Sequence, residues 1–272
     1  MSDTFVSVAN VAKVFELRHD TVEALRSVSF TAREGEFIAI LGPSGCGKST
    51  LLMMCAGLES MTSGSIEIAG RPITGPRESI GIMFQEPTLL PWKTVLENVL
   101  FPIRILKRPV SEFLPRAKQL IELVGLKGFE DRKPHQLSGG MRQRVSICRA
   151  LVYDPDVLLM DEPFSALDAI TRDEMNVALL DIWQRHRKTA LFVTHSIREA
   201  VFLADRVLVM AQRPGTVLED LPIPFQRPRD FALGDTPRFN EICAHLRSVV
   251  GLGKGQGGAA SIAATDAVRG RG

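Results

Sequence analysis

Residues 42–50 bring glycines, a lysine and hydroxyl side chains together in one short stretch. They read Gly-Pro-Ser-Gly-Cys-Gly-Lys-Ser-Thr, which has the G-x-x-x-x-G-K-[ST] spacing of a phosphate-binding loop. Glycines let backbone N–H groups turn toward an anion, and a following helix adds the positive end of its dipole. The stretch therefore predicts a nucleotide phosphate site; the alternative is a glycine-rich turn with an exposed lysine. The residues expected at the nucleotide are Gly42, Pro43, Ser44, Gly45, Cys46, Gly47, Lys48, Ser49 and Thr50.

Two carboxylates follow the apolar run at residues 157–160. Ionised carboxylates at the end of a buried strand are costly unless a cation or hydrogen bonds compensate them. We expect Asp161 and the Ser49 hydroxyl to bind Mg²⁺. We expect Lys48 to contact the β- and γ-phosphates. Glu162 is placed to polarise a water that attacks the γ-phosphate. The alternative is a pair of carboxylates that caps a helix.

Three further features separate the chain from a generic nucleotide-binding protein. Residues 137–141, Leu-Ser-Gly-Gly-Met, precede a predicted helix and form a second candidate anion site through Ser138, Gly139 and Gly140. Gln85 follows the apolar run 80–84, where its amide could hold Mg²⁺ or the attacking water. His195 follows the run 189–194, where its imidazole could contact the γ-phosphate. Taken singly, Gln85 fits a loop residue and His195 a structural group, but the ordered set favours function.

The elements that must position these residues alternate along the chain. Apolar runs without polar interruption indicate strands buried on both faces of a mostly parallel sheet. Strands are predicted at 5–8, 27–31, 36–41, 64–70, 80–84, 157–161, 189–194 and 206–210. Helices are predicted at 48–56, 95–106, 111–124, 139–152, 171–187 and 238–250, and a short one is predicted after Ser196.

This order predicts one α/β domain over residues 1–250. Its α/β core spans about 5–85 and 156–220, and an all-helical segment at about 86–155 is inserted into it. A C-terminal extension follows at 221–250. The Gly/Ala-rich tail, 251–272, has no apolar periodicity and is expected to be disordered.

Composition narrows the function classes. The chain has 272 residues, 45% hydrophobic and 24% charged, as in a globular protein. A formal net charge of +2 gives no strong field for nucleic acid or anionic lipid. The 4 cysteines show no C-x-x-C spacing, which argues against a zinc site or a disulfide framework and fits a reducing cytosol. The first residues lack a basic segment followed by an apolar run, so no secretory signal is expected, and no apolar run approaches the ~18 residues of a spanning helix.

Over about residues 5–220, the ordered set resembles the nucleotide-binding subunits of ABC transporters. The resemblance implies a P-loop NTPase cassette with an N-terminal antiparallel β-subdomain and an inserted helical subdomain, and it implies ATP and Mg²⁺ as cofactors. It implies catalytic roles for Glu162, His195, Gln85 and Lys48, and Mg²⁺ ligation by Ser49, Gln85 and Asp161. Asp168, in the D-loop 165–168, and Phe15 would also serve the nucleotide, Phe15 by stacking on adenine unless it is a core residue. Met141 and Phe15 depart from the commoner Gln and Tyr.

In the family two cassettes close head to tail over ATP, so the resemblance implies a homodimer. Ser138, Gly139 and Gly140 would then serve the γ-phosphate bound to the partner chain. The run 89–92, Leu-Leu-Pro-Trp, exposes apolar surface unless it is core or meets another protein. In importers this region receives the membrane permease, so Leu89, Leu90 and Trp92 are its expected contacts; the alternative is that Trp92 fills the core.

The same region, with 137–144 and 204–215, resembles the nitrate, sulfonate and taurine importer branch. This implies a peripheral ATPase at the cytoplasmic face of the inner membrane, served indirectly by a periplasmic binding protein, with a small anion as cargo and no nucleic acid partner. Polyamine, sulfate, methionine or pyrimidine-precursor import are the alternatives. A soluble ABC ATPase would carry a coiled coil or tandem cassettes, and a P-loop kinase or GTPase would leave 137–141 unexplained. Cys46, at a helix N-terminus, could be a reactive thiolate or an inert thiol.

Overall fold

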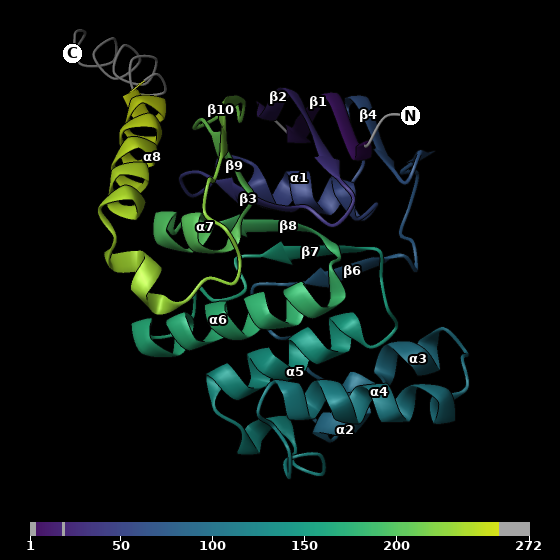
Figure 1. Cartoon of the computed structure of the whole chain (residues 1–272). Coiled ribbons are helices and arrows are strands. Elements are labelled where there is room, and N and C mark those ends of the chain that lie inside the picture. The colour runs from purple at the N-terminus through teal and green to yellow at the C-terminus, as the bar shows by residue number, and fades with distance from the viewer. Residues whose placement is uncertain (1–3, 18–19, 256–272) are drawn as a thin grey trace, which may run out of the picture. The chain divides into compact units, whose positions relative to one another are not determined.

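The computed structural model describes residues 4–17 and 20–255 (Figure 1). The chain divides into two compact units. The first unit comprises residues 1–76 and 193–272, and the second comprises residues 77–192. The predicted α/β class is confirmed, since strands and helices alternate and the buried strands pair in parallel in both units.

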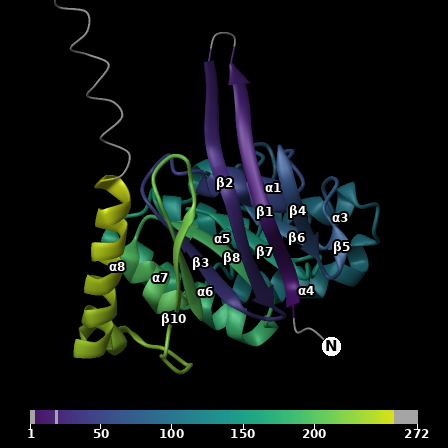
Figure 2. The same cartoon turned by 90° about the horizontal axis from the view of Figure 1, so that it is seen from above.

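An antiparallel sheet opens the first unit. Its strands are β1 (Thr4–Leu17), β2 (Asp20–Arg33), β4 (Ser63–Ile68) and β5 (Arg71–Pro72), in the order β2-β1-β4-β5. Figure 2 shows β1 and β2 side by side as a long hairpin, with β4 next to β1. The strands predicted at 5–8 and 27–31 are far shorter than these. The reason is that the pairing register shifts between Val8 and Val11 and again around Lys13, which breaks the two-residue alternation on which the prediction depends.

Three further strands of the first unit pair with one another. β3 (Phe37–Leu41) is buried along its whole length and pairs in parallel with β9 (Arg206–Met210). β10 (Val217–Pro222) pairs with β9 in the antiparallel direction and was not predicted. It alternates between exposed and half-buried residues and contains Glu219 and Asp220, so it lacks the apolar run that marks the buried strands.

The helices of the first unit are α1 (Lys48–Cys55), α7 (Ile197–Leu203) and α8 (Pro237–Gly255), with the short 3₁₀ turn η2 (Phe231–Asp235) before α8. Gly57 follows α1 with a φ of 71°, which confirms its role in ending that helix. Buried Arg229 donates to the carbonyl oxygens of Val201, Phe202 and Ala204 and so ties the C-terminal extension to the end of α7. α8 continues to Gly255, past its predicted end at residue 250, and residues 256–272 of the predicted tail lie outside the described residues.

The second unit holds β6 (Ile80–Met83), β7 (Val157–Asp161) and the start of β8 (Thr189–Thr194), in the order β8-β7-β6. Only helices lie between β6 and β7, as predicted: α2 (Val95–Val99), α3 (Phe101–Ile105), α4 (Val110–Leu123), η1 (Pro134–Gln136) and α5 (Gly139–Leu151). α6 (Ala169–His186) links β7 to β8. The single helix predicted at 95–106 is wrong, because the chain forms two helices that meet at Leu100. Pro102, in the first turn of α3, cannot donate a backbone hydrogen bond, which favours a helix start there over a continuous helix.

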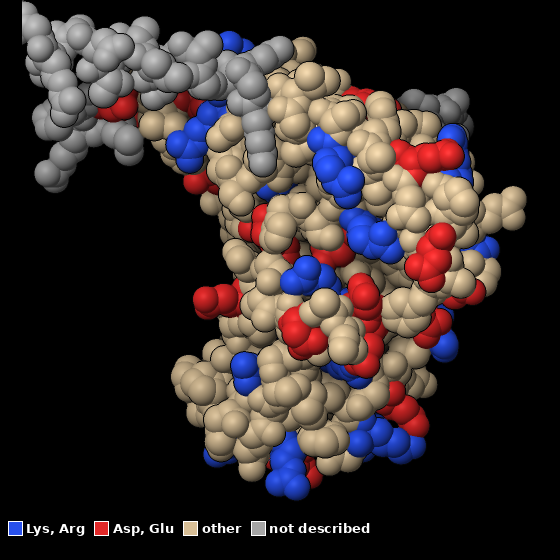
Figure 3. All heavy atoms as spheres, turned by 90° about the vertical axis from the view of Figure 1, so that its left-hand side faces the viewer, with Lys and Arg blue, Asp and Glu red and all other residues tan. Residues whose placement is uncertain are grey.

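The helices and the surface charges of the structure agree with the composition. Among the described residues, no helix is both long and apolar enough to span a bilayer. On the face drawn in Figure 3, basic and acidic side chains are intermixed and no large patch of one sign is seen. This distribution fits the small formal charge of +2.

Candidate nucleotide-binding site

The predicted phosphate loop, residues 42–50, connects β3 to α1 in the first unit. Gly45 and Gly47 have φ values of 76° and 94°, a region that L side chains rarely adopt. A Cβ at Gly47 would lie 2.6 Å from Leu25 Cδ2 and 2.9 Å from the Ala24 carbonyl oxygen. Glycine is therefore required there for two reasons, backbone conformation and the close approach of β2.

Lys48 is folded back over this loop. The residue is only 4% exposed. Its Nζ donates to the carbonyl oxygens of Gly42 at 2.9 Å and Pro43 at 3.0 Å. These bonds hold the ammonium group inside the curve of the loop, while Ser49 is exposed beside it at the start of α1. A positive charge within a turn of backbone N–H groups is the arrangement that binds phosphate. The alternative of a turn with an exposed lysine is wrong, because Lys48 is buried.

The segment after β9 supports the phosphate loop from outside. Arg213 Nε donates to the carbonyl oxygen of Gly45 at 2.9 Å. Gly215 lies so close that a Cβ there would be 2.1 Å from the Cys46 carbonyl oxygen, and its N–H donates to Ala24 O at 2.9 Å. Sequence reasoning assigned no role to Arg213. Its signal in the sequence was only the Arg-Pro-Gly run in the stretch 204–215.

Cys46 lies at the centre of the loop and is completely buried. Burial raises the pKa of its thiol, and this effect exceeds the opposing influence of the Lys48 charge. The burial of Cys46 and the direction of this shift favour the alternative of an inert thiol. The helix N-terminus favours an anion, but desolvation of a buried sulfur disfavours it more.

Phe15 lies in β1 on the face of the hairpin that meets the phosphate loop. Lys13 pairs across the strands with Leu25, whose side chain lies against Gly47. Lys13 Nζ lies over the ring of Phe15, 4.7 Å from its centroid, so the two side chains lie on the same face of β1. The Phe15 side chain is half-buried. This placement suits a nucleobase platform beside a phosphate loop, and adenine stacking stays a prediction.

The carboxylates and Gln85 meet at one edge of the second unit. β6 and β7 are parallel with Met83 opposite Met160, so Gln85 and Glu162 follow neighbouring strand ends. Gln85 Nε2 donates to Ser165 Oγ at 3.2 Å, and that hydroxyl donates to the Glu162 carbonyl oxygen at 3.0 Å. Asp161 is 9% exposed, and Glu162 has a φ of 41°, an uncommon conformation for a residue with a side chain. Carboxylate and amide oxygens are ligand types that suit Mg²⁺, and here both follow neighbouring strand ends.

Asp168 has a defined structural partner at the start of α6. Its carboxylate accepts from the Thr171 N–H at 3.0 Å and from the Thr171 hydroxyl at 2.7 Å. These hydrogen bonds lower the pKa of Asp168. Asp168 therefore caps α6, which fixes where the D-loop ends and the helix begins.

The second glycine site lies at the start of α5. Ser138 caps this helix through a hydrogen bond from the Met141 N–H to its hydroxyl at 3.2 Å, and Ser138 and Gly139 are both exposed. Gly140 is buried, and a Cβ there would lie 2.8 Å from Thr171 Cγ2. The cap uses the backbone of Met141, so the departure from the commoner Gln leaves it intact.

His195 is exposed directly after β8, in the first unit. The residues around it are held in place: the Ser196 N–H donates to Thr194 Oγ1 at 2.9 Å, and Thr194 Oγ1 donates to Glu199 at 2.5 Å. Ser196 also caps α7, as predicted, by accepting from the Glu199 N–H at 3.4 Å. The imidazole is thus placed between a strand end and a capped helix.

The loop with Leu89, Leu90 and Trp92 is held firmly while Trp92 points outward. Buried Asn98 accepts from the Leu90 N–H at 2.8 Å and donates to the Leu90 carbonyl oxygen at 3.2 Å. Arg149 of α5 donates to the carbonyl oxygen of Pro87 at 2.7 Å. Trp92 is 66% exposed, so the alternative that it fills the core is wrong. Leu89 and Leu90 are half-buried beside it.

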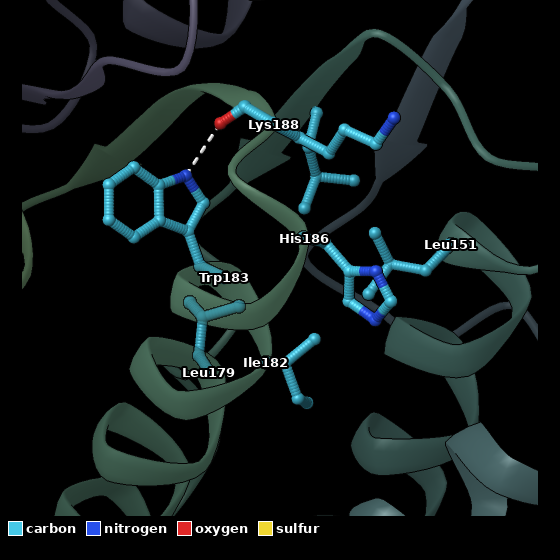
Figure 4. Close-up of a pocket in the computed structure, with 7 residues that line it drawn as sticks. Leu151, Leu179, Ile182, Trp183, His186 and Lys188 are labelled. Atoms are coloured by element: carbon cyan, nitrogen blue, oxygen red, sulfur yellow. Dashed lines mark hydrogen bonds between the residues drawn. The ribbon is translucent and has the colours of Figure 1, made fainter.

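A separate small pocket lies between α5, β7 and α6 (Figure 4). Trp183 faces it, and its indole N–H donates to the Lys188 carbonyl oxygen at 2.6 Å. Burial and the nearby Arg116 charge lower the pKa of His186, which also lines it. None of the predicted site residues lines this pocket, and most of its lining is apolar. It is a gap in the core packing of the second unit and does not resemble a phosphate site.

The comparisons with known proteins agree with this geometry. Residues 25–165 match the ABC transporter family. A bicarbonate transport ATP-binding protein of Synechocystis is 48% identical over 83% of this chain and 81% of its own length. An aliphatic sulfonates import ATP-binding protein of Bacillus cereus is 43% identical over 87% of this chain and 92% of its own length.

A solved structure supports the same assignment. It is a dimeric ATP-binding cassette in a post-hydrolysis state, bound to ADP and inorganic phosphate. It matches with a TM-score of 0.71 and 33% identity, over 81% of this chain and all of its own length. The chain therefore belongs to the ABC transporter family, as an ATP-binding protein that hydrolyses ATP.

Proposed function

We propose that this chain is the ATPase subunit of an importer for a small anion, and that it works as a head-to-tail pair at the cytoplasmic face of the inner membrane. One observation carries the proposal: the chain has two glycine-built helix N-termini, one packed closely against β2 and the segment after β9 and the other exposed at Ser138 and Gly139. The first is the phosphate loop before α1, and the second is the Ser138–Gly139 end of α5. An exposed anion site is explained if a second copy brings its bound nucleotide to it.

In the proposed site the phosphate loop binds the nucleotide through its N–H groups and Lys48. Ser49, Gln85 and Asp161 would hold Mg²⁺, which neutralises phosphate charge when bound. Glu162 orients and deprotonates the attacking water. His195 donates to the γ-phosphate.

The hydrogen-bonded series Gln85–Ser165–Glu162 gives the glutamate a fixed backbone position.

Because only the triphosphate reaches both chains, nucleotide binding favours the closed pair, and hydrolysis removes that preference.

The cargo proposal rests on the relatives. One is named for bicarbonate and another for aliphatic sulfonates, at 48% and 43% identity. Both cargoes are small anions; nitrate is another, and taurine carries the same sulfonate group. The similar identities also indicate that the ATPase sequence does not set the cargo. A permease and a periplasmic binding protein would set it, and the permease would contact this chain at Leu89, Leu90 and Trp92.

The decisive experiment uses the Glu162→Gln variant. It should bind Mg·ATP, hydrolyse it more than about 100-fold more slowly, and elute as a dimer in size-exclusion chromatography with ATP. The same variant with Mg·ADP should remain monomeric and is the matched control. Near-normal hydrolysis would remove Glu162 from the base role, and a strict monomer with ATP would contradict the paired site.

A second experiment tests the cargo. Cells that lack the gene for this chain should lose uptake of labelled taurine, an alkanesulfonate, nitrate or bicarbonate, and the intact gene should restore it. Uptake of all four compounds at the normal rate in the deletion strain would contradict the proposed cargo class.

A further inference from the structure

Lys13 is a lysine in the middle of β1 that is almost completely buried, with 7% exposure. Its Nζ donates to Glu59 Oε1 at 2.6 Å, to the Ser60 carbonyl oxygen at 2.7 Å and to Ser60 Oγ at 3.4 Å. An ammonium group has three donors, so these partners account for all of them. The charge is therefore fixed in one place, and a buried lysine that is held this way requires an explanation.

The same ammonium lies over the ring of Phe15, with Nζ 4.7 Å from the ring centroid. This is a cation–π contact, and it covers one face of the ring. Phe15 is only half-buried, so the ring keeps exposed surface. A ring with one face against a fixed cation can offer only its other face to a ligand.

The partners of Lys13 connect Phe15 to the phosphate loop at both ends of α1. At the N-terminal end, Leu25, the cross-strand partner of Lys13, lies against Gly47. At the C-terminal end, the N–H groups of Leu58 and Glu59 donate to the Met53 carbonyl oxygen at 2.9 and 3.3 Å. Glu59 is therefore attached to the end of the helix whose start carries the phosphate loop. Through Lys13, the ring of Phe15 is positioned relative to that helix.

We propose that Lys13 is a positioning residue for the nucleobase: held by Glu59 and Ser60, it fixes the Phe15 ring as a one-sided stacking platform at a set distance from the phosphate loop. The inference rests on the proposed stacking role of Phe15. It predicts that Lys13 contributes to binding of the base and not to binding of the phosphates. A Lys13 with only a structural role would affect both ligands equally, through the population of folded protein.

The test is isothermal titration calorimetry of the full chain with Mg·ADP and with magnesium pyrophosphate, neither of which has a γ-phosphate. Lys13→Met keeps the length of the side chain and removes the charge. It should weaken ADP binding about three- to tenfold and leave pyrophosphate binding unchanged. Lys127→Met is the matched control, because Lys127 also pairs with a glutamate, Glu122, but on the exposed surface of the other unit.

Two further variants separate the possible failures. Phe15→Ala should weaken ADP binding at least as much, and adding Lys13→Met to it should have no further effect. Glu59→Gln, at a side chain 35% exposed, keeps the lysine and should give a smaller loss of ADP binding even if Lys13→Met folds poorly. Thermal unfolding of each variant accompanies the titrations.

Each remaining outcome overturns a specific statement. Equal losses for ADP and pyrophosphate in both Lys13→Met and Glu59→Gln, or independent effects of Lys13 and Phe15, would show that Lys13 does not act through the ring. Unchanged ADP binding in Phe15→Ala would remove the stacking platform and this inference with it. That last result would leave the proposed ATPase role of the phosphate loop and Glu162 intact.

Discussion

The two glycine-built helix ends of this chain differ in how much of the chain surrounds them. At the phosphate loop, Cys46 is fully buried, Lys48 is bonded to two carbonyl oxygens of the loop, and Arg213 and Gly215 hold the outer side. At the start of α5, the Ser138 hydroxyl caps the helix, and Ser138 and Gly139 are open.

The difference separates a site that one chain assembles from a site that one chain only offers. A loop that binds phosphate by itself must hold its N–H groups in the binding geometry before the ligand arrives, which requires close packing around glycines. A helix end that meets a ligand carried by another chain must stay accessible. Substitutions at the two ends should therefore affect different measurements.

The largest expected effect is at Gly47. Gly47→Ala places a Cβ at a φ of 94° and within 3 Å of Leu25 Cδ2 and the Ala24 carbonyl oxygen. We expect a loss of about 2–4 kcal/mol in the free energy of unfolding, measured with urea, and no detectable ADP binding. Gly139→Ala is the matched control, since its Cβ would find Leu167 Cδ2 at 3.8 Å, an ordinary contact.

Gly139→Ala should keep the unfolding free energy and ADP binding of the unsubstituted chain. If Gly47→Ala were equally stable and still bound ADP, the phosphate loop would not be the closely packed site described here. Equal damage from both alanines would erase the distinction between the enclosed and the exposed end.

Features that depend on neighbouring residues were predictable from the sequence, and contacts between residues far apart in the sequence were not. The loop between β3 and α1, the end of α1 at Gly57 and the apolar strands β3, β7, β8 and β9 follow from local patterns, so they were predicted correctly. The contacts of Arg213 and Lys13 were not predicted, because each joins residues far apart in sequence: 168 positions separate Arg213 from Gly45. The bulges of β1 interrupt its two-residue alternation, so its full length was not predicted. Apolar spacing predicted one helix at 95–106, but the chain begins a second helix at Phe101, next to Pro102.

A smaller and more selective effect is expected at Ser138. Ser138→Ala removes the cap of α5, which costs about 1 kcal/mol in the free energy of unfolding. It should leave ADP binding unchanged, because ADP is bound by the phosphate loop alone in this proposal. ATP-dependent dimerisation in the Glu162→Gln background should fall about tenfold or more, as measured by analytical ultracentrifugation.

Thr94→Ala is the control for this substitution. Thr94 caps α2 in the same way, with its hydroxyl accepting from the Glu97 N–H at 3.3 Å, and it lies outside the proposed nucleotide site. It should lower the unfolding free energy to a similar extent and leave dimerisation intact. If Ser138→Ala dimerised as well as Thr94→Ala, the start of α5 would be a structural cap and not half of a shared site.

The smallest expected effect is at Arg213, which tests how much the enclosed end depends on its outer support. Arg213→Ala removes one hydrogen bond to the Gly45 carbonyl oxygen, worth about 0.5–1.5 kcal/mol, so calorimetry should find ADP bound about two- to tenfold more weakly. Arg26→Ala is its control, because that exposed side chain pairs with Glu23 while its backbone N–H keeps the bond to Gly215. Unchanged ADP affinity in Arg213→Ala would mean that the phosphate loop keeps its binding geometry without the Arg213 side chain. The outer side of the loop would then be held by the close approach of Gly215 to Cys46, and the comparison with the exposed end would rest on Gly47 and Gly215.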